Sequence, residues 1–169
     1  AFDVKAMAAK RVLFIVHREQ ILRDALKSFQ NVLPHKTMGY LVGQKKEIQK
    51  DIVFTTIQTI AKSETLQLFS ATEFDYVIVD EAHRSGAASY IKVLQHLKPK
   101  FLLGMTATPE RNDSFNIFEL FDYNLAYEIR LKQALEENML TPFHYFGVAD
   151  VCIDGIEISE QAKIAELIS

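Results

Sequence analysis

The chain has 169 residues, of which 49% are hydrophobic and 24% are charged, and its formal net charge is −3. These proportions exclude a disordered or fibrous chain, and the length suffices for one domain with a hydrophobic core. A negative net charge excludes a protein that binds nucleic acid through a positive charge spread over the whole chain. Any binding of nucleic acid therefore has to come from particular residues.

Short apolar runs alternate with amphipathic stretches over the first hundred residues, which predicts an α/β fold with a mainly parallel sheet flanked by helices. The predicted strands are residues 12–16, 37–42, 51–56, 76–79 and 101–105. The predicted helices are residues 3–10, 19–33, 57–71 and 87–97. Pro34 and Pro99 end two of these helices, because proline cannot continue a helix beyond its first turn.

The pattern becomes weaker after Pro109. We expect a helix over 114–121, a strand over 125–129, a helix over 131–140, a strand over 142–148 and a partly helical tail over 156–168. Because a helix ends before a new strand at Thr141-Pro142, we place a domain boundary there. Residues 1–140 would form the first domain, and residues 141–169 would begin a second domain or a linker.

The clearest chemical signal is the segment from Tyr76 to His83, an apolar run that ends in D-E-A-H. A buried parallel strand that ends in two carboxylates places acid at the sheet edge where open α/β folds bind ligands. Asp80 can hold a magnesium ion through water, and Glu81 can orient or deprotonate an attacking water. The alternative is a strand end with solvated charges.

A second apolar strand is followed by T-A-T-P over residues 106–109. The hydroxyls of Thr106 and Thr108 can bond both toward a nucleotide and toward a neighbouring domain, and Pro109 prevents the strand from continuing. Thr-Pro by itself is an ordinary turn. Its position one strand–helix–strand unit after the acidic segment makes it a stronger sign of function.

Together, D-E-A-H and G-M-T-A-T-P-E-R resemble motifs II and III of superfamily-2 helicases, and among these the restriction-enzyme and DNA-repair types. Residues 14–22 resemble motif Ia, and residues 53–59 resemble the motif that follows it, Ib or Ic. The four matches come in the family's order and cover roughly residues 1 to 140. The resemblance implies a RecA-like domain of a nucleic-acid-dependent ATPase that uses ATP and Mg²⁺ to move along or unwind a duplex.

The resemblance also implies a role for each matching residue. Asp80 would coordinate Mg²⁺ through water, Glu81 would be the catalytic base, and His83 would relay the ATP state to motif III. Thr106 and Thr108 would couple hydrolysis to movement of a second RecA-like domain of the same protein. The residues that would contact phosphates and sugars are His17, Arg18, Thr55, Thr56 and Gln58.

Plainer interpretations stay open for several of these residues. His17 and Arg18 could form a polar helix start, and Thr55 and Thr56 could be ordinary strand residues. The pair Lys45-Lys46 could meet phosphate, although a solvated helix face is the simpler expectation.

One motif of the family is missing from the 169 residues, because nothing matches the phosphate-binding pattern G-x-x-x-x-G-K-[ST]. We expect that loop, and the strand before it, upstream of Ala1, so the sheet would lack the phosphate-loop strand. The second motor domain would lie downstream. We therefore expect these residues alone to be inactive as an ATPase.

Two other classes of protein stay open. The chain could be an inactive nucleic-acid-binding or scaffolding domain derived from a helicase, or an α/β enzyme unrelated to ATP, such as a flavodoxin-like protein. The intact Asp80-Glu81 pair argues against the first, and the four ordered motifs argue against the second. The sequence does not decide between DNA and RNA, but the restriction and repair resemblance favours DNA.

Cys152 is the only cysteine, which excludes an internal disulfide and fits a reducing, cytoplasmic setting. No apolar run approaches the roughly 18 residues needed to cross a bilayer, and no signal segment opens the sequence. We therefore expect a cytoplasmic protein without a membrane partner.

Overall fold

The computed structural model describes residues 1–84, 88–107, 117–137, 139, 141, 152–153 and 156–157. The chain divides into two compact units, Ala1–Leu125 and Ala126–Ser169. All of the predicted site residues belong to the first unit, although Thr108 lies outside the described residues. The boundary expected at Thr141-Pro142 concerns the organisation of a longer protein and stays a prediction.

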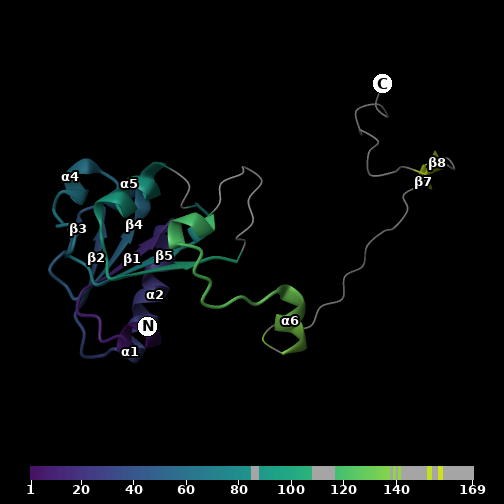
Figure 1. The fold of residues 1–169 in the computed structure, drawn as a ribbon, viewed down its shortest axis with the longest axis horizontal. Helices are drawn as coiled ribbons and strands as arrows, with labels where there is room; N and C mark the ends of the chain where they lie inside the picture. The colour runs from purple at the N-terminus through teal and green to yellow at the C-terminus, as the bar shows by residue number, and fades with distance from the viewer. Residues whose placement is uncertain are drawn as a thin grey trace, which may run out of the picture. The chain divides into compact units, whose positions relative to one another are not determined.

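The first unit is built on a sheet with helices packed against it (Figure 1). The sheet has six strands in the order β3-β2-β4-β1-β5-β6. The strands are β1 (Val12–Val16), β2 (Met38–Val42), β3 (Lys45–Lys46), β4 (Ile52–Thr56), β5 (Tyr76–Asp80) and β6 (Phe101–Met105). Neighbouring strands run parallel except for β3, which pairs antiparallel with β2. The predicted α/β fold with a mainly parallel sheet is therefore confirmed.

Helices cover both faces of this sheet. They are α1 (Phe2–Ala6), α2 (Glu19–Val32), α3 (Ile57–Ile60), α4 (Ser63–Leu66) and α5 (Ala88–His96). Side chains alternate along a strand, so Phe14 of β1 packs with α1 and α2, whereas Ile15 packs with α3, α4 and α5. Strands β1 and β4 are buried along their whole length, which explains their unbroken apolar sequences.

Three phenylalanines fix α2 on the sheet. The ring of Phe29 on α2 meets Phe14 of β1 with centroids 5.7 Å apart and Phe54 of β4 with centroids 5.5 Å apart, both edge to face. Leu22, one turn from the start of the helix, is also buried against this face. The packing therefore holds α2 against the sheet, with only His17 and Arg18 between the end of β1 and the start of the helix.

Three predicted elements in the first hundred residues differ from the structure. The helix expected over 3–10 is shorter, since α1 ends at Ala6. Residues 57–71, expected as one helix, contain the two short helices α3 and α4, because Lys62 has an extended backbone (φ −63°, ψ 131°) that interrupts the helical bonding. The interruption lets Ile60 and Leu66 pack into one core. The expectation of a helix face at Lys45-Lys46 is wrong, because these residues pair with β2 as β3.

The predictions after residue 109 fare less well. The strand expected over 125–129 is wrong: residues 124–130 have no regular structure, and no described strand pairs with them. Within the expected helices the structure has a 3-10 helix, η2 (Ile117–Phe121), and α6 (Leu131–Glu136).

The last described residues form a short antiparallel pair, β7 (Cys152–Ile153) and β8 (Ile156–Glu157). The helical tail expected from residue 156 is therefore wrong at its start. The strand expected over 142–148 lies outside the described residues. None of the helices that the structure describes has the length and apolar character needed to cross a membrane.

Asp75 ties together the amino ends of three strands. Its Oδ2 accepts hydrogen bonds from the main-chain N–H groups of Lys10 and Arg11, at 3.0 and 3.1 Å, just before β1. Its Oδ1 lies 2.7 Å from Nζ of Lys100, just before β6. These contacts lower the pKa of Asp75 to about 2. The contact with Lys100 has the largest effect, and the hydrogen bond from the N–H of Arg11 has the next largest.

Asp75→Asn should lower the free energy of unfolding at neutral pH by about 1–3 kcal/mol, because it removes the charged acceptor of these bonds. The pKa of Asp75 is depressed below its ordinary value of 3.8, so the stabilisation is present above that pH and is lost as the pH falls toward 2. Urea unfolding near pH 7 and near pH 3 tests this. The difference between wild type and variant should shrink at the lower pH, while the exposed control Asp24→Asn should change little at either. An equal loss at both pH values would contradict the assignment.

Candidate functional site

The register of the parallel strands brings the predicted acidic and threonine segments together at the carboxyl edge of the sheet. β5 ends at Asp80, which pairs with Met105 at the end of β6. Glu81 and Thr106 therefore follow on adjacent strands. Thr108 lies outside the described residues, so its place in this group stays a prediction.

His83 joins the acidic segment to the end of β6. Its Nδ1 lies 3.1 Å from Oε2 of Glu81 and 3.0 Å from Oγ1 of Thr106. A proton on Nδ1 can be shared between these two oxygens, so the pair of contacts favours the tautomer that carries hydrogen on Nδ1. The Glu81 side chain is 43% exposed, so its carboxylate is held by His83 and still reaches solvent.

The backbone at Glu81 has an uncommon conformation. Its φ of 54° lies in the left-handed region, which among the described non-glycine residues only Ala8, Asp122 and Tyr123 share. A residue with a side chain adopts this region at a cost in conformational energy, and such residues gather at functional sites. The turn ends β5 and begins the 3-10 helix η1 (Ala82–Arg84), which carries His83 toward Thr106.

The Asp80 carboxyl, at the end of β5, is partly buried. Burial raises its pKa above the ordinary value of 3.8. The main-chain N–H of Glu81, 3.0 Å from Oδ1 of Asp80, opposes that rise, and the Glu81 carboxylate adds to it. A cation beside Asp80 would favour its charged form.

The described residues contain no cluster of three or more His, Cys, Asp or Glu side chains that could hold a metal ion by itself. Mg²⁺ does not require such a cluster, because it keeps several waters and takes one or two carboxylates together with the phosphates of a nucleotide. Asp80, partly buried and next to Glu81, fits that requirement. These residues are therefore suited to Mg²⁺ only when a phosphate ligand completes its coordination.

A second group of predicted residues lies at the ends of β1 and β4, where Val16 pairs with Thr56. Beyond the strands, Nε2 of Gln58 lies 3.4 Å from Nδ1 of His17. Arg18 and Gln58 are exposed. His17, Arg18 and Gln58 thus form one accessible polar surface, which we call the β1–β4 rim.

The two threonines of β4 do not share this exposure. Thr55 is 0% exposed, and its hydroxyl donates to the carbonyl of Leu41 on β2 at 2.8 Å. The Thr56 hydroxyl lies 3.0 Å from that of Thr59, at the start of α3. The Thr55 side chain therefore holds β4 to β2, while Thr56 borders the β1–β4 rim.

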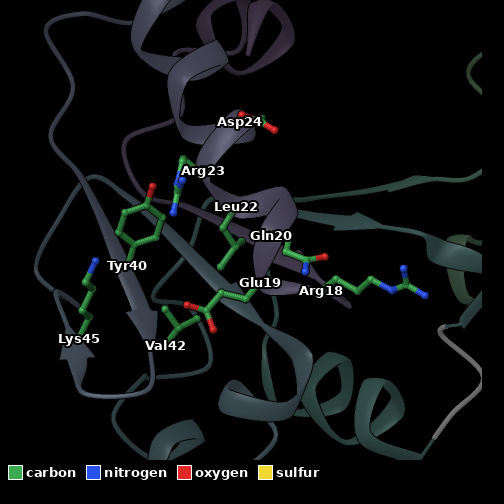
Figure 2. Close-up of a pocket in the computed structure, with 9 residues that line it drawn as sticks. All are labelled: Arg18, Glu19, Gln20, Leu22, Arg23, Asp24, Tyr40, Val42 and Lys45. Atoms are coloured by element: carbon green, nitrogen blue, oxygen red, sulfur yellow. The ribbon is translucent and has the colours of Figure 1, made fainter.

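Next to the rim, a hollow of about 870 Å³ opens between α2 and the β2–β3 hairpin (Figure 2). Leu22, Tyr40 and Val42 give it apolar and aromatic surface, and Arg18 belongs both to its lining and to the rim. Sequence reasoning missed this hollow because it depends on the hairpin, and Lys45-Lys46 carried no strand signal.

The model of the protein family described as "Type III restriction enzyme, res subunit" matches residues 1–111. The chain is 27% identical over 135 residues to the protein named "Putative ATP-dependent RNA helicase L396" of Acanthamoeba polyphaga mimivirus. That match covers 77% of this chain and 24% of the mimivirus protein, so the chain spans about a quarter of its relative's length.

Two solved structures share the fold at 21% sequence identity. The Sulfolobus solfataricus SWI2/SNF2 ATPase core in complex with dsDNA matches with a TM-score of 0.55, over 70% of this chain and 26% of that one. The Type ISP restriction-modification enzyme LlaGI, in complex with a DNA substrate mimic, matches with a TM-score of 0.52, over 76% of this chain and 16% of that one.

Proposed function

We propose that the chain forms part of the ATP-driven motor of a nucleic-acid helicase or translocase, because it belongs to the family described as the type III restriction enzyme res subunit. The resemblance to superfamily-2 helicases predicted from the motifs is confirmed by that membership. The observation that carries the proposal is the joining of Glu81 and Thr106 through His83 at the carboxyl edge of the sheet.

In this proposal Glu81 orients the attacking water and takes up its proton. Its carboxylate reaches solvent, where a water can approach within hydrogen-bond distance, and the His83 contact fixes its position. Asp80 would hold Mg²⁺ through water, and the bound ion would offset the negative charge of the phosphates. His83 contacts both Glu81 and Thr106, so a change at the nucleotide can reach the end of β6, where Thr106 and Thr108 would meet a second RecA-like domain.

The phosphates would be held by another segment of the full-length protein, since the 169 residues contain no G-x-x-x-x-G-K-[ST] loop. β6 is an edge strand, and no described strand pairs with its outer side. Phe101 and Met105 are exposed along it. A strand that carries the phosphate loop would fit this edge, and without it we expect the 169 residues to show no measurable ATP hydrolysis.

The nucleic acid along which the motor moves would bind at the β1–β4 rim. His17, Arg18 and Gln58 offer donors that suit phosphates and sugars, and such contacts position a strand without reading its sequence. Two fold relatives were solved with DNA or a DNA mimic, which supports DNA, whereas the name of the mimivirus relative points to RNA. We propose DNA, in keeping with the restriction-enzyme family.

Arg18→Gln in the full-length protein should raise the DNA concentration needed for half-maximal stimulation of ATP hydrolysis by about 3–10-fold, because one charged contact to phosphate is lost. The maximal rate should stay close to that of wild type, since Arg18 takes no part in the contacts that join Glu81, His83 and Thr106. Titration of ATP hydrolysis against DNA at fixed salt measures both quantities. Lys98→Gln, an equal charge change at the exposed amino edge of β6, is the matched control. An identical shift in the control would show that only overall charge matters.

A further inference from the structure

We propose that the hollow between α2 and the β2–β3 hairpin binds one nucleotide of the nucleic-acid strand, with its base against Tyr40 and its phosphate beside Lys45. This inference rests on the proposed function, because it extends the nucleic-acid-binding surface from the β1–β4 rim into the hollow. Arg18 belongs to both the rim and the lining of the hollow. A strand that contacts the rim would pass directly into the hollow.

The hairpin places its hollow-lining residues on one face. Tyr40 and Val42 are two positions apart on β2, so their side chains share a face, and Lys45 pairs directly with Val42 across the hairpin. The turn between the strands contains Gly43 in the left-handed region, with a φ of 54°, which suits glycine. Lys45 is thereby brought over the Tyr40 ring, with Nζ 5.1 Å from the ring centroid.

Tyr40 is held in place as a stacking surface. Its ring contacts Phe54 with centroids 6.4 Å apart, and its main-chain N–H donates to the Glu47 carboxylate at 2.9 Å. Tyr40 as a whole is half-buried, and it lines the hollow. A fixed aromatic ring stacks on a base with little further loss of conformational entropy, and every base has a π face to offer.

The charges around the hollow suit a nucleotide phosphate. Arg18, Arg23 and Lys45 are cationic, whereas Glu19 and Asp24 are the two carboxylates in the lining. Figure 2 shows Arg23 pointing toward Tyr40 from α2, whereas Asp24 points away from it. Among the charged residues that line the hollow, the cations Arg23 and Lys45 are therefore the ones beside the Tyr40 ring.

Glu19 favours a nucleotide over a bare phosphate as the occupant. Its side chain extends from the start of α2 toward Val42, within the hollow (Figure 2). A carboxylate there repels a phosphate, but it can accept a hydrogen bond from the amino group of a base. With Leu22 and Val42 giving apolar surface, the lining fits a base and its phosphate at separate positions.

The test is the affinity of the full-length protein for a fluorescein-labelled single-stranded DNA, measured by anisotropy at fixed salt. Tyr40→Leu should weaken binding by about 10-fold, and Lys45→Gln by about 3–10-fold. Tyr40→Phe keeps the ring and should bind within about twofold of wild type, as should the control Lys98→Gln. DNA carrying 5-iodouracil should photocross-link to the peptide that contains Tyr40.

The outcomes separate this inference from the proposed function. If Arg18→Gln weakens binding but Tyr40→Leu and Lys45→Gln stay within about twofold of wild type, the hollow does not hold a nucleotide and the rim still does. If the wild-type protein binds neither DNA nor RNA, the proposed function and the inference both fail. If Tyr40→Phe binds as weakly as Tyr40→Leu, the loss does not come from stacking and the base position is wrong.

Discussion

Glu81→Gln in the full-length protein is expected to slow nucleic-acid-stimulated ATP hydrolysis by about 10²–10⁴-fold, the range of a lost general base. The amide keeps the size of the side chain and can still contact His83. It cannot take up the proton of the attacking water. Because Asp80 and the β1–β4 rim stay intact, binding of ATP and of nucleic acid should remain near wild type.

Steady-state hydrolysis and nucleic-acid affinity, measured on the same preparation, check this expectation. Glu119→Gln makes the same chemical change at an exposed position on η2 and should leave the rate unchanged. A Glu81→Gln protein that keeps more than about a tenth of the wild-type rate would show that another group acts as the base.

Phe54→Ala should give the largest loss of stability among simple core truncations, about 3–5 kcal/mol. Phe54 is 0% exposed and lies at the centre of the contacts with Phe14 and Phe29, at 5.6 and 5.5 Å between ring centroids. Truncation leaves a cavity between β4 and α2 that the neighbouring rings cannot fill without moving. Domains of this size are stable by only about 5–15 kcal/mol, so much of the variant would unfold under mild denaturant.

Urea unfolding followed by circular dichroism measures that loss. Phe2→Ala removes the same ring from a position that is 76% exposed, and its effect should stay below about 1 kcal/mol. A loss below about 1 kcal/mol for Phe54→Ala would contradict the packing of α2 on the sheet. It would also remove the reason for the position of Arg18 at the start of α2.

The strands were predictable from sequence because burial on both faces leaves an unbroken apolar run. The predicted bounds of β1 and β6 are those of the structure, and those of β2, β4 and β5 differ by one residue. Short elements without such a run were not predictable. β3 consists of two lysines, and its pairing depends on the turn at Gly43 and on β2 rather than on its own composition.

The chemistry of the site was predictable, but the exposure of its members was not. The motifs predicted Glu81, His83 and Thr106 as site residues because they follow strands with unbroken apolar sequences. The parallel register of β5 and β6 brings the three residues together. Thr55 also sits in a matching motif, yet its strand is covered on both faces, so its side chain is buried. Strict alternation would have shown which residues face outward, and β4 lacks it.

The most direct test is ATP hydrolysis by the full-length protein without nucleic acid, with DNA and with RNA. We predict hydrolysis that rises on addition of nucleic acid, more with DNA than with RNA. A rate that neither nucleic acid changes, or no hydrolysis under any of the three conditions, would contradict the motor. The acidic segment would then be a remnant in a binding or scaffolding domain.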